Sequence, residues 1–161
     1  MSNKIKIEIS VFSLDAAIKA AGAGADRLEL CAGPAEGGTT PPLSLIKSVC
    51  QRVNIPVYPI IRPGGGGFNY SDDEFEMMKE DIRLCKAAGC AGVAVGVLDK
   101  AGKVDESRSR KLVELASPMG VSFIRAFDLV PDPAKAVETL IKAGCERILT
   151  SGQTPKATEA L

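Results

Sequence analysis

The chain has 161 residues and a mass of 16.9 kDa, which is the size of one ordinary domain. Its 20 Lys and Arg residues balance 20 Asp and Glu residues, which argues against nucleic acid or an anionic membrane as the main partner. The absence of histidine excludes Ser-His-Asp and Cys-His catalysis and imidazole metal sites, and leaves carboxylates, Arg, Lys, Cys, Ser, Thr and Tyr for chemistry.

Short apolar segments that predict β-strands alternate with segments of helical periodicity. The predicted strands are Lys4–Ser10, Arg27–Cys31, Pro56–Arg62, Gly92–Leu98, Val121–Phe127 and Arg147–Thr150. The predicted helices are Leu14–Ala21, Leu43–Arg52, Asp73–Ala88, Ser107–Ser117 and Pro133–Ala143. This alternation predicts a parallel sheet with right-handed crossovers.

Several helix ends carry their own signals. Ser71 stands three residues before Glu74, which is the spacing of a capping box at a helix start. Three helix ends share an Ala-Gly turn followed by a strand, with Gly24, Gly89 and Gly144 at the position that favours a left-handed residue. The similarity indicates an internal repeat of βα units, although any α/β protein needs turns of this kind.

The first two strands alternate polar and apolar residues. Lys6 and Glu8 alternate with isoleucines, and Arg27, Glu29 and Cys31 alternate with leucines. Central strands of an open parallel sheet are usually apolar on both faces, so this pattern favours a barrel with a polar interior. Polar edge strands of an open sheet remain the alternative.

Longer motifs are spread from the first strand to the end of the chain. They are Ile7–Ile9, Gly24–Cys31, Ala35–Pro41, Ile61–Pro63, Phe68–Asp72, Asp81–Ile82, Arg125–Asp128 and Arg147–Gln153. Together they resemble the CutC copper-homeostasis family. The resemblance implies a (βα)8-like barrel, a site at the C-terminal ends of its strands, and a link to copper.

The chain also departs from the family pattern. Ser10 stands where the family typically has Cys, Gly64 and Gly67 replace an Arg and an Asp, and Ile124 replaces a His. Family members continue well beyond Gln153 with two further βα units. We therefore predict one partial domain over residues 1–161, an α/β, TIM-barrel-like (βα)8 fold that is incomplete and has about six parallel βα units.

Glu8, Glu29 and Arg62 are the strongest candidates for a site, because we expect all three at or near C-terminal strand ends. Glu8 and Glu29 are the candidate catalytic acid and base, and Arg62 is the candidate clamp for an anion. The alternative is a buried ion network within the barrel. Whether the chain only binds a small polar or anionic ligand, is an enzyme, or is a truncated copy without activity stays open.

A second group of candidates follows the fifth and sixth strands. Arg125 and Asp128 either clamp the ligand or pair with each other to anchor the loop. Ser151 belongs to a motif shared with the family and completes the predicted ligand-binding set.

Cysteine usage bears on both redox state and metal binding. The five cysteines form no CxxC pair, and the N-terminus reads as a strand with no signal peptide, so we expect reduced thiols in the cytoplasm. Cu(I) prefers two or three converging soft ligands, and Cys31 alone falls at a C-terminal strand end. We therefore name Cys31 as the candidate metal ligand, with copper a cofactor only by family resemblance, and expect weak copper binding.

A partial barrel leaves two strand edges whose N–H and C=O groups are ready to pair with another chain. Lys4 and Lys6 blunt the first edge, whereas Arg147–Thr150 carries one charge. We expect a homo-oligomer formed through these edges, unless the terminal residues fold back over the gap. No apolar run approaches the roughly 18 residues of a membrane span.

Overall fold

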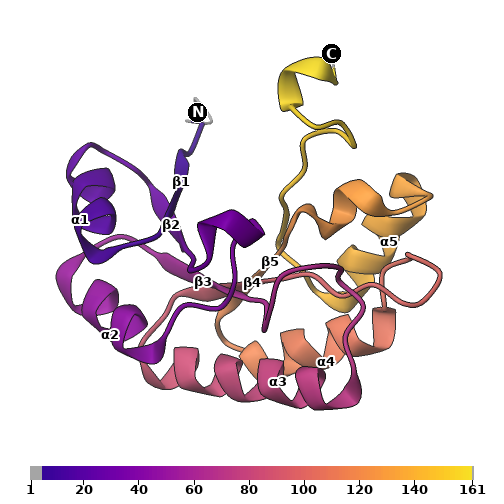
Figure 1. The fold of residues 1–161 in the computed structure, drawn as a ribbon, viewed down its shortest axis with the longest axis horizontal. Helices are drawn as coiled ribbons and strands as arrows, with labels where there is room; N and C mark the ends of the chain where they lie inside the picture. Colours follow the sequence, from indigo (N-terminus) through magenta and orange to yellow (C-terminus); the bar gives the residue numbers. More distant parts are fainter. Residues whose placement is uncertain (1–4, 161) are drawn as a thin grey trace.

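The six strands of the sheet are parallel and follow one another in chain order (Figure 1). A computed structural model describes residues 5–160, so Lys4 and Leu161, which belong to the predicted first strand and domain, lie outside the described residues. The strands are β1 (Glu8–Val11), β2 (Arg27–Leu30), β3 (Val57–Ile61), β4 (Gly92–Val95), β5 (Gly120–Phe123) and β6 (Arg147–Ile148). The sheet curls into an incomplete, TIM-barrel-like α/β half-barrel, which confirms the predicted fold class.

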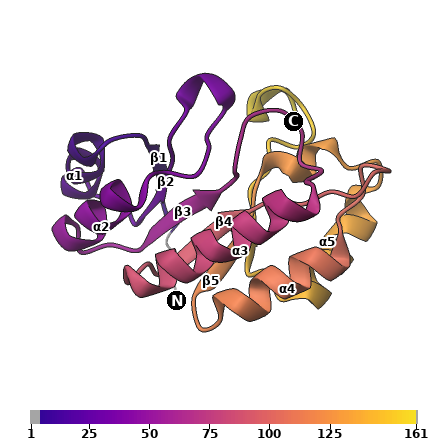
Figure 2. The same cartoon turned by 60° about the horizontal axis from the view of Figure 1, so that its bottom comes forward.

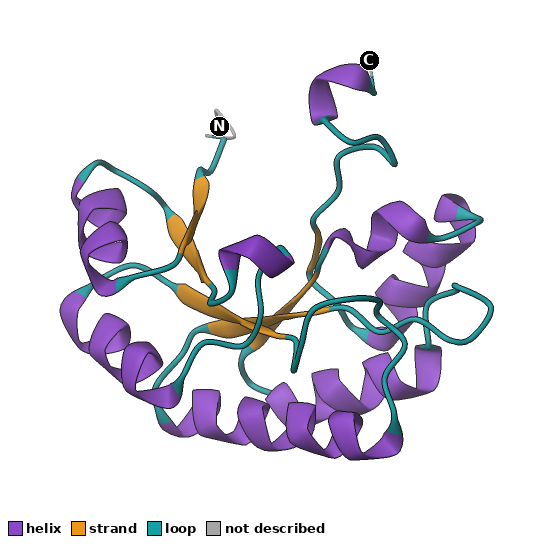
Figure 3. Ribbon diagram, viewed as in Figure 1, coloured by secondary structure: helices purple, strands orange, loops and turns teal. Residues whose placement is uncertain are grey.

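The helices cover the convex outer face of the curled sheet (Figure 3). They are α1 (Leu14–Gly22), α2 (Leu43–Arg52), α3 (Asp72–Ala87), α4 (Glu106–Ala116) and α5 (Pro133–Ala143). The short 3-10 helices η1 (Pro34–Glu36), η2 (Arg125–Leu129) and η3 (Ala157–Glu159) belong to the segments that follow β2, β5 and β6. Figure 2 shows α3 and α4 side by side beneath the sheet. None of the helices in residues 5–160 is long and apolar enough to cross a membrane.

The predicted helix signals are confirmed. The Ser71 hydroxyl accepts from the Glu74 backbone N–H at 3.1 Å, and the Ser71 N–H donates to the Glu74 carboxylate at 2.8 Å. Gly24, Gly89 and Gly144 all have positive φ, between 82° and 99°, as the three Ala-Gly turns require.

The fourth, fifth and sixth strands end earlier than the sequence predicts. After Val95 and Phe123 the backbone leaves the ladder, since the Leu98 N–H donates to the Phe68 carbonyl and the Phe127 N–H donates to the Ile124 carbonyl. The residues after β5 therefore form η2. Apolarity extended the predicted fourth and fifth strands because the segments that follow them are themselves buried, as Val97, Leu98, Ala126 and Phe127 show.

Alternation along the strands divides the sheet into two faces. Leu28 and Leu30 of β2 are fully buried, and residues of α2 and α3 such as Val49 and Ile82 are fully buried in the same core. Each such side chain contributes about 1.5–3 kcal/mol through burial. The strand residues that alternate with these buried side chains face the inside of the curl. We name this inner side of the sheet the concave face.

Candidate functional site on the concave face

The lowest layer of the concave face is an ion pair between two strand starts. Glu8 lies opposite Arg27 in the parallel register, and its carboxylate accepts from the Nε and Nη2 atoms of the Arg27 guanidinium. Glu8 is the first residue of β1, so its predicted place near the C-terminal strand end is wrong. The strand begins four residues later than predicted and runs on to Val11, whose carbonyl accepts from the Cys31 N–H.

Tyr58 extends this layer across the sheet. The guanidinium carbons of Arg27 and Arg147 lie 5.1 and 4.7 Å from the centre of its ring, and its hydroxyl donates to Glu146 at 2.7 Å. Arg147 also pairs with Glu146 and donates to the Ser122 hydroxyl. These contacts hold the nearby cations around one aromatic ring.

Two glycines make room for that ring. A Cβ atom on Gly92 would lie 2.0 Å from the Tyr58 ring, and one on Gly120 would lie 2.5 Å from its hydroxyl. Sequence reasoning missed this network. The signal was the glycine that opens β4 and the one that opens β5, positions where β-branched residues are usual.

Glu29 occupies the next layer up and has different surroundings. Its side chain is buried, with only 7% of the residue exposed, and its Oε2 atom accepts from the Ser10 hydroxyl at 2.6 Å. The Cys31 sulfur lies 3.7 Å from the same oxygen. Among residues 5–160, no Arg or Lys nitrogen lies within ion-pair distance of Glu29. Burial therefore raises the pKa of this carboxyl above its ordinary value, although the Ser10 hydrogen bond opposes the shift.

Glu29 lies between two cavities. The lower one, of about 110 Å³, is also lined by Glu8, Arg27, Ser122 and Arg147. The upper one, of about 190 Å³, is lined by Ser10, Arg62, Phe68 and Arg125 among others. Ile124, which stands where the family pattern has His, lines both. The buried carboxyl group is therefore the polar group that the two cavities share.

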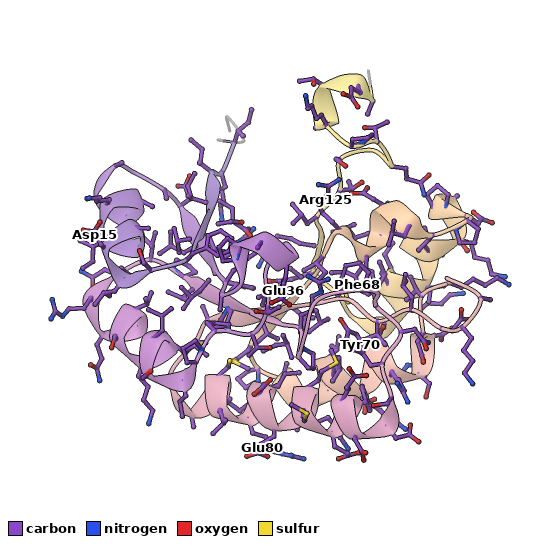
Figure 4. The ribbon with its side chains drawn as sticks, in the orientation of Figure 1. Asp15, Glu36, Phe68, Tyr70, Glu80 and Arg125 are labelled. Carbon is purple, nitrogen blue, oxygen red and sulfur yellow. The ribbon has the colours of Figure 1, made fainter. Side chains whose placement is uncertain are left out.

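Arg62 lies at the mouth of the half-barrel, as predicted, but its donors serve the loops. Its Nη1 atom donates to the carbonyls of Glu36 and Gly38 at 2.7 and 2.9 Å, and its Nη2 atom donates to the Gly66 carbonyl at 2.7 Å. The guanidinium also stacks on Phe68, with 4.9 Å between the guanidinium carbon and the ring centre. Figure 4 shows Glu36 and Phe68 near the middle of the molecule, whereas Asp15 and Glu80 lie on the outer helices.

The third group of predicted residues is brought together after β5 and β6. Asp128 accepts from the Arg125 Nε at 2.9 Å, and from the backbone N–H and hydroxyl of Ser151, both at 3.0 Å. Burial alone would raise the pKa of Asp128, but hydrogen bonds from Thr150, Arg125 and the Ser151 and Gln153 amides lower it well below the ordinary value. These contacts match the alternative in which Arg125 and Asp128 pair with each other and anchor the loop. Arg125, whose side chain is 49% exposed, still reaches the upper cavity.

Cys31 is buried beside Glu29, and burial together with the nearby carboxylate raises the pKa of its thiol. Within residues 5–160, no three His, Cys, Asp or Glu side chains are arranged to hold a metal ion. The structure places four of the predicted site residues on the concave face, namely Glu8, Glu29, Arg62 and Arg125. Their roles toward a ligand stay predictions.

The chain is similar in sequence to proteins of one known family. The CutC family model matches residues 5–161. A CutC family protein of Salmonella schwarzengrund strain CVM19633 is 48% identical over 155 residues, which cover 96% of this chain and 62% of the relative. A second, from Salmonella enteritidis PT4 strain P125109, gives the same identity and coverage. The chain thus spans about 62% of the length of these curated relatives.

Solved structures give the same result for the fold. A CutC from Streptococcus agalactiae, described as a candidate copper homeostasis protein, superposes with a TM-score of 0.89 at 31% identity, over 94% of this chain and 75% of that one. A phosphoenolpyruvate phosphomutase from Streptomyces platensis subsp. rosaceus has a TM-score of 0.64 at 16% identity, over 91% of this chain and 60% of that one. The second likeness concerns the fold alone.

Proposed function

The chain belongs to the CutC family, and we propose that it acts in copper homeostasis by holding a small polar or anionic ligand against Glu29 on the concave face. The family supports the first part, since the solved Streptococcus agalactiae relative is named for copper homeostasis. The second part rests on one observation, a buried carboxyl group between two cavities with no cation of residues 5–160 paired to it.

The neighbours of Glu29 define the chemistry of the ligand. Ser10 and Ser122 offer hydroxyl groups, and Arg125 offers a half-exposed guanidinium at the upper cavity. Burial raises the pKa of Glu29 and so favours its protonated form, in which the carboxyl hydroxyl donates to an oxygen of the ligand. Together these groups suit a small molecule with hydroxyl or carboxylate oxygens, which is held by few polar contacts.

Copper itself fits these residues poorly. Cu(I) favours two or three soft ligands, but the concave face offers Cys31 with a carboxylate oxygen as its neighbour. The raised pKa of the Cys31 thiol further opposes the thiolate that would bind copper. Titration of the reduced protein with Cu(I) against a competing chelator should give weak or substoichiometric binding. Tight one-to-one binding that Cys31→Ser abolishes would contradict this.

Copper tolerance tests the proposed function in cells. The chain should improve growth at elevated copper in a bacterium whose own CutC gene has been deleted. Glu29→Ala should lose most of that benefit, whereas Glu138→Ala, an equivalent change on the exposed surface of α5, should keep it. Equal growth with both variants, at equal protein levels, would show that copper tolerance does not require Glu29.

Ligand binding requires a separate measurement on the purified protein. Acetate and glycerol, titrated separately and followed by amide NMR, test a carboxylate and a hydroxyl ligand. We expect one of them to shift the signals of Ser10, Glu29 and Arg125, and Glu29→Ala to abolish those shifts. Shifts confined to the outer helices would place the ligand elsewhere.

An acid–base reaction is the second candidate function, because the raised pKa of Glu29 suits a general acid. Glu8 already pairs with Arg27 and Arg62 already donates to three carbonyls, so this candidate depends mainly on Glu29. Glu29→Gln separates the two functions. It should abolish acid–base turnover but keep part of the binding, since an amide still donates a hydrogen bond.

We also propose that the chain self-associates through its sheet edges. Within residues 5–160, β1 pairs with β2 alone and β6 with β5 alone. Apolar side chains stand near both edges, with Ile7 54% exposed, Ile9 39% and Leu149 42%. Unpaired edges of this kind favour pairing with another chain. Sedimentation across a concentration series should show a mass above 17 kDa that grows with concentration, and a stable monomer at high micromolar concentration would contradict the proposal.

A further inference from the structure

Three thiols meet on the outer side of the sheet, away from the concave face. Cys50 lies in the last turn of α2, Cys85 near the end of α3, and Cys90 in the turn that leads into β4. The sulfur atoms of Cys50 and Cys90 are 3.7 Å apart. The Cys90 N–H donates to the Cys85 carbonyl at 3.1 Å, and the Cys85 thiol also influences the pKa of Cys90. Cys50 is 40 residues away from Cys90 in the sequence, yet the fold brings the two thiols together.

The two nearest thiols differ in their access to solvent. Cys50 is half-buried, whereas Cys85 and Cys90 are buried. A dissolved oxidant therefore reaches Cys50 first, with Cys90 in contact behind it. A disulfide needs the two sulfurs to approach by about 1.7 Å, from 3.7 Å to about 2.05 Å. Cys90 follows Gly89, whose φ of +82° places this residue in the turn that ends α3, outside any helix or strand.

We propose that Cys50 and Cys90 are a modification site that forms a reversible intrachain disulfide with peroxide as the oxidant. The Cys50 thiol ionises, its thiolate attacks one peroxide oxygen, and the O–O bond breaks. Sulfenic acid forms on Cys50, and the leaving hydroxide takes up the proton lost by the thiol to become water. The Cys90 thiolate then attacks that sulfur, the S–O bond breaks, and a second water leaves. Two thiols and one hydrogen peroxide thus give one disulfide and two waters, and a dithiol reductant reverses the change.

The environment of the pair also fixes how its reaction depends on pH. The hydrogen bond with Cys90, and then burial, raises the pKa of Cys50. For Cys90 a hydrogen bond from Cys50 lowers the pKa, but Cys85 and burial raise it, to about 12. Since the thiolate is the nucleophile, the cross-link should form slowly at neutral pH and about tenfold faster for each added pH unit below these pKa values.

Peptide mapping of the full chain tests the proposal. Trypsin releases the three cysteines on separate peptides, residues 48–52, 84–86 and 87–100. After hydrogen peroxide at pH 9, the non-reduced digest should contain peptide 48–52 joined to peptide 87–100 as the main cross-link. Dithiothreitol should remove it. Cys50→Ser should abolish it, and Cys145→Ser, a half-buried thiol outside the cluster, should leave it intact.

Other results would overturn the proposal. They are a cross-link that includes peptide 84–86, a cross-link between two chains, sulfinic acid on Cys50 with no cross-link, or no oxidation at pH 9. Thermal unfolding of the reduced variants shows whether Cys50→Ser still folds. If it does not, the unmutated chain decides alone, because its digest already separates the three thiols.

Discussion

Two carboxylates on the same concave face, Glu8 and Glu29, have opposite surroundings. Glu8 accepts from the Arg27 guanidinium in the lowest layer. Glu29 lies two residues beyond Arg27 on the same strand, is more deeply buried, and has the Ser10 hydroxyl and the Cys31 thiol as its neighbours at hydrogen-bonding distance. A charged group with a partner stabilises a fold, whereas a buried one without a cation costs stability and is available for a ligand.

The lower layer explains why, within residues 5–160, no Arg or Lys forms an ion pair with Glu29. Arg27 and Arg147 both line the lower cavity with Glu29, but each stacks on Tyr58 and pairs with another carboxylate. The aromatic ring and its glycine neighbours therefore direct positive charge away from the next layer. The paired layer and the unpaired carboxyl are two parts of one arrangement, and the following changes test each part.

Gly92→Ala should have the largest effect, because its Cβ would collide with the Tyr58 ring 2.0 Å away. Displacing the ring would break the paired layer, at a cost of about 3 kcal/mol in the free energy of unfolding. Urea denaturation measures this cost. Gly22→Ala is the matched control, because nothing lies within 4 Å of its Cβ position, and it should leave stability unchanged or raised. Equal effects of the two changes on stability would show that the close approach of Gly92 to the Tyr58 ring is not important for the fold.

Arg27→Ala should come next, since it leaves Glu8 unpaired and removes a stacking partner from Tyr58. The two side chains are 17% and 28% exposed, so solvent screening limits the loss to about 1–2 kcal/mol. Arg110→Ala breaks an exposed pair with Glu106 and should cost at most about 0.5 kcal/mol. The same Arg27 change should raise the pKa of Glu29 further, because Arg27 lowers it in the parent. An unchanged pKa of Glu29 in this variant would mean that the two layers are independent.

Ser10→Ala should cost about 1 kcal/mol or less, because it removes the hydrogen bond to Glu29. It should also raise the pKa of Glu29, because the hydrogen bond from Ser10 lowers that pKa in the parent. Ser44→Ala, on the exposed side of α2, provides the comparison and should be neutral. If both substitutions give the same unfolding curve and Glu29 titrates as before, Ser10 is not its partner in solution.

Glu29→Gln should change stability least at neutral pH, by about 0.5 kcal/mol, and in the stabilising direction. Its main effect is on pH dependence. The folded pKa of Glu29 lies above the ordinary 4.5, so its favourable contribution is complete below 4.5 and is lost as pH rises through the folded value. The stability of Glu29→Gln relative to the parent should therefore increase as the pH rises above 4.5, until Glu29 is deprotonated in the folded parent. A constant difference would show that Glu29 titrates normally.

The sequence predicted the fold well, because periodicity, capping residues and the Ala-Gly turns act locally. The bounds of α2 and α5 are as expected, and the parallel order follows from the alternation of strands and helices. The site was harder to predict. The concave placement of Glu29 followed from alternation in β2, but the partners of Arg62 and Tyr58 come from residues distant in sequence, such as Gly38 and Glu146. Such contacts depend on the curled shape of the sheet, which local patterns do not encode.

The central claim is that Glu29 is a buried carboxyl without a cationic partner among the described residues 5–160. Carboxyl ¹³C NMR titration of the reduced full chain, with the Glu29 signal assigned by comparison with Glu29→Gln, measures it directly. The account predicts a midpoint for Glu29 above its ordinary value of 4.5, and a further rise in Ser10→Ala. A midpoint at or below 4.5 would show that Glu29 is solvated or paired in solution, and would contradict the account.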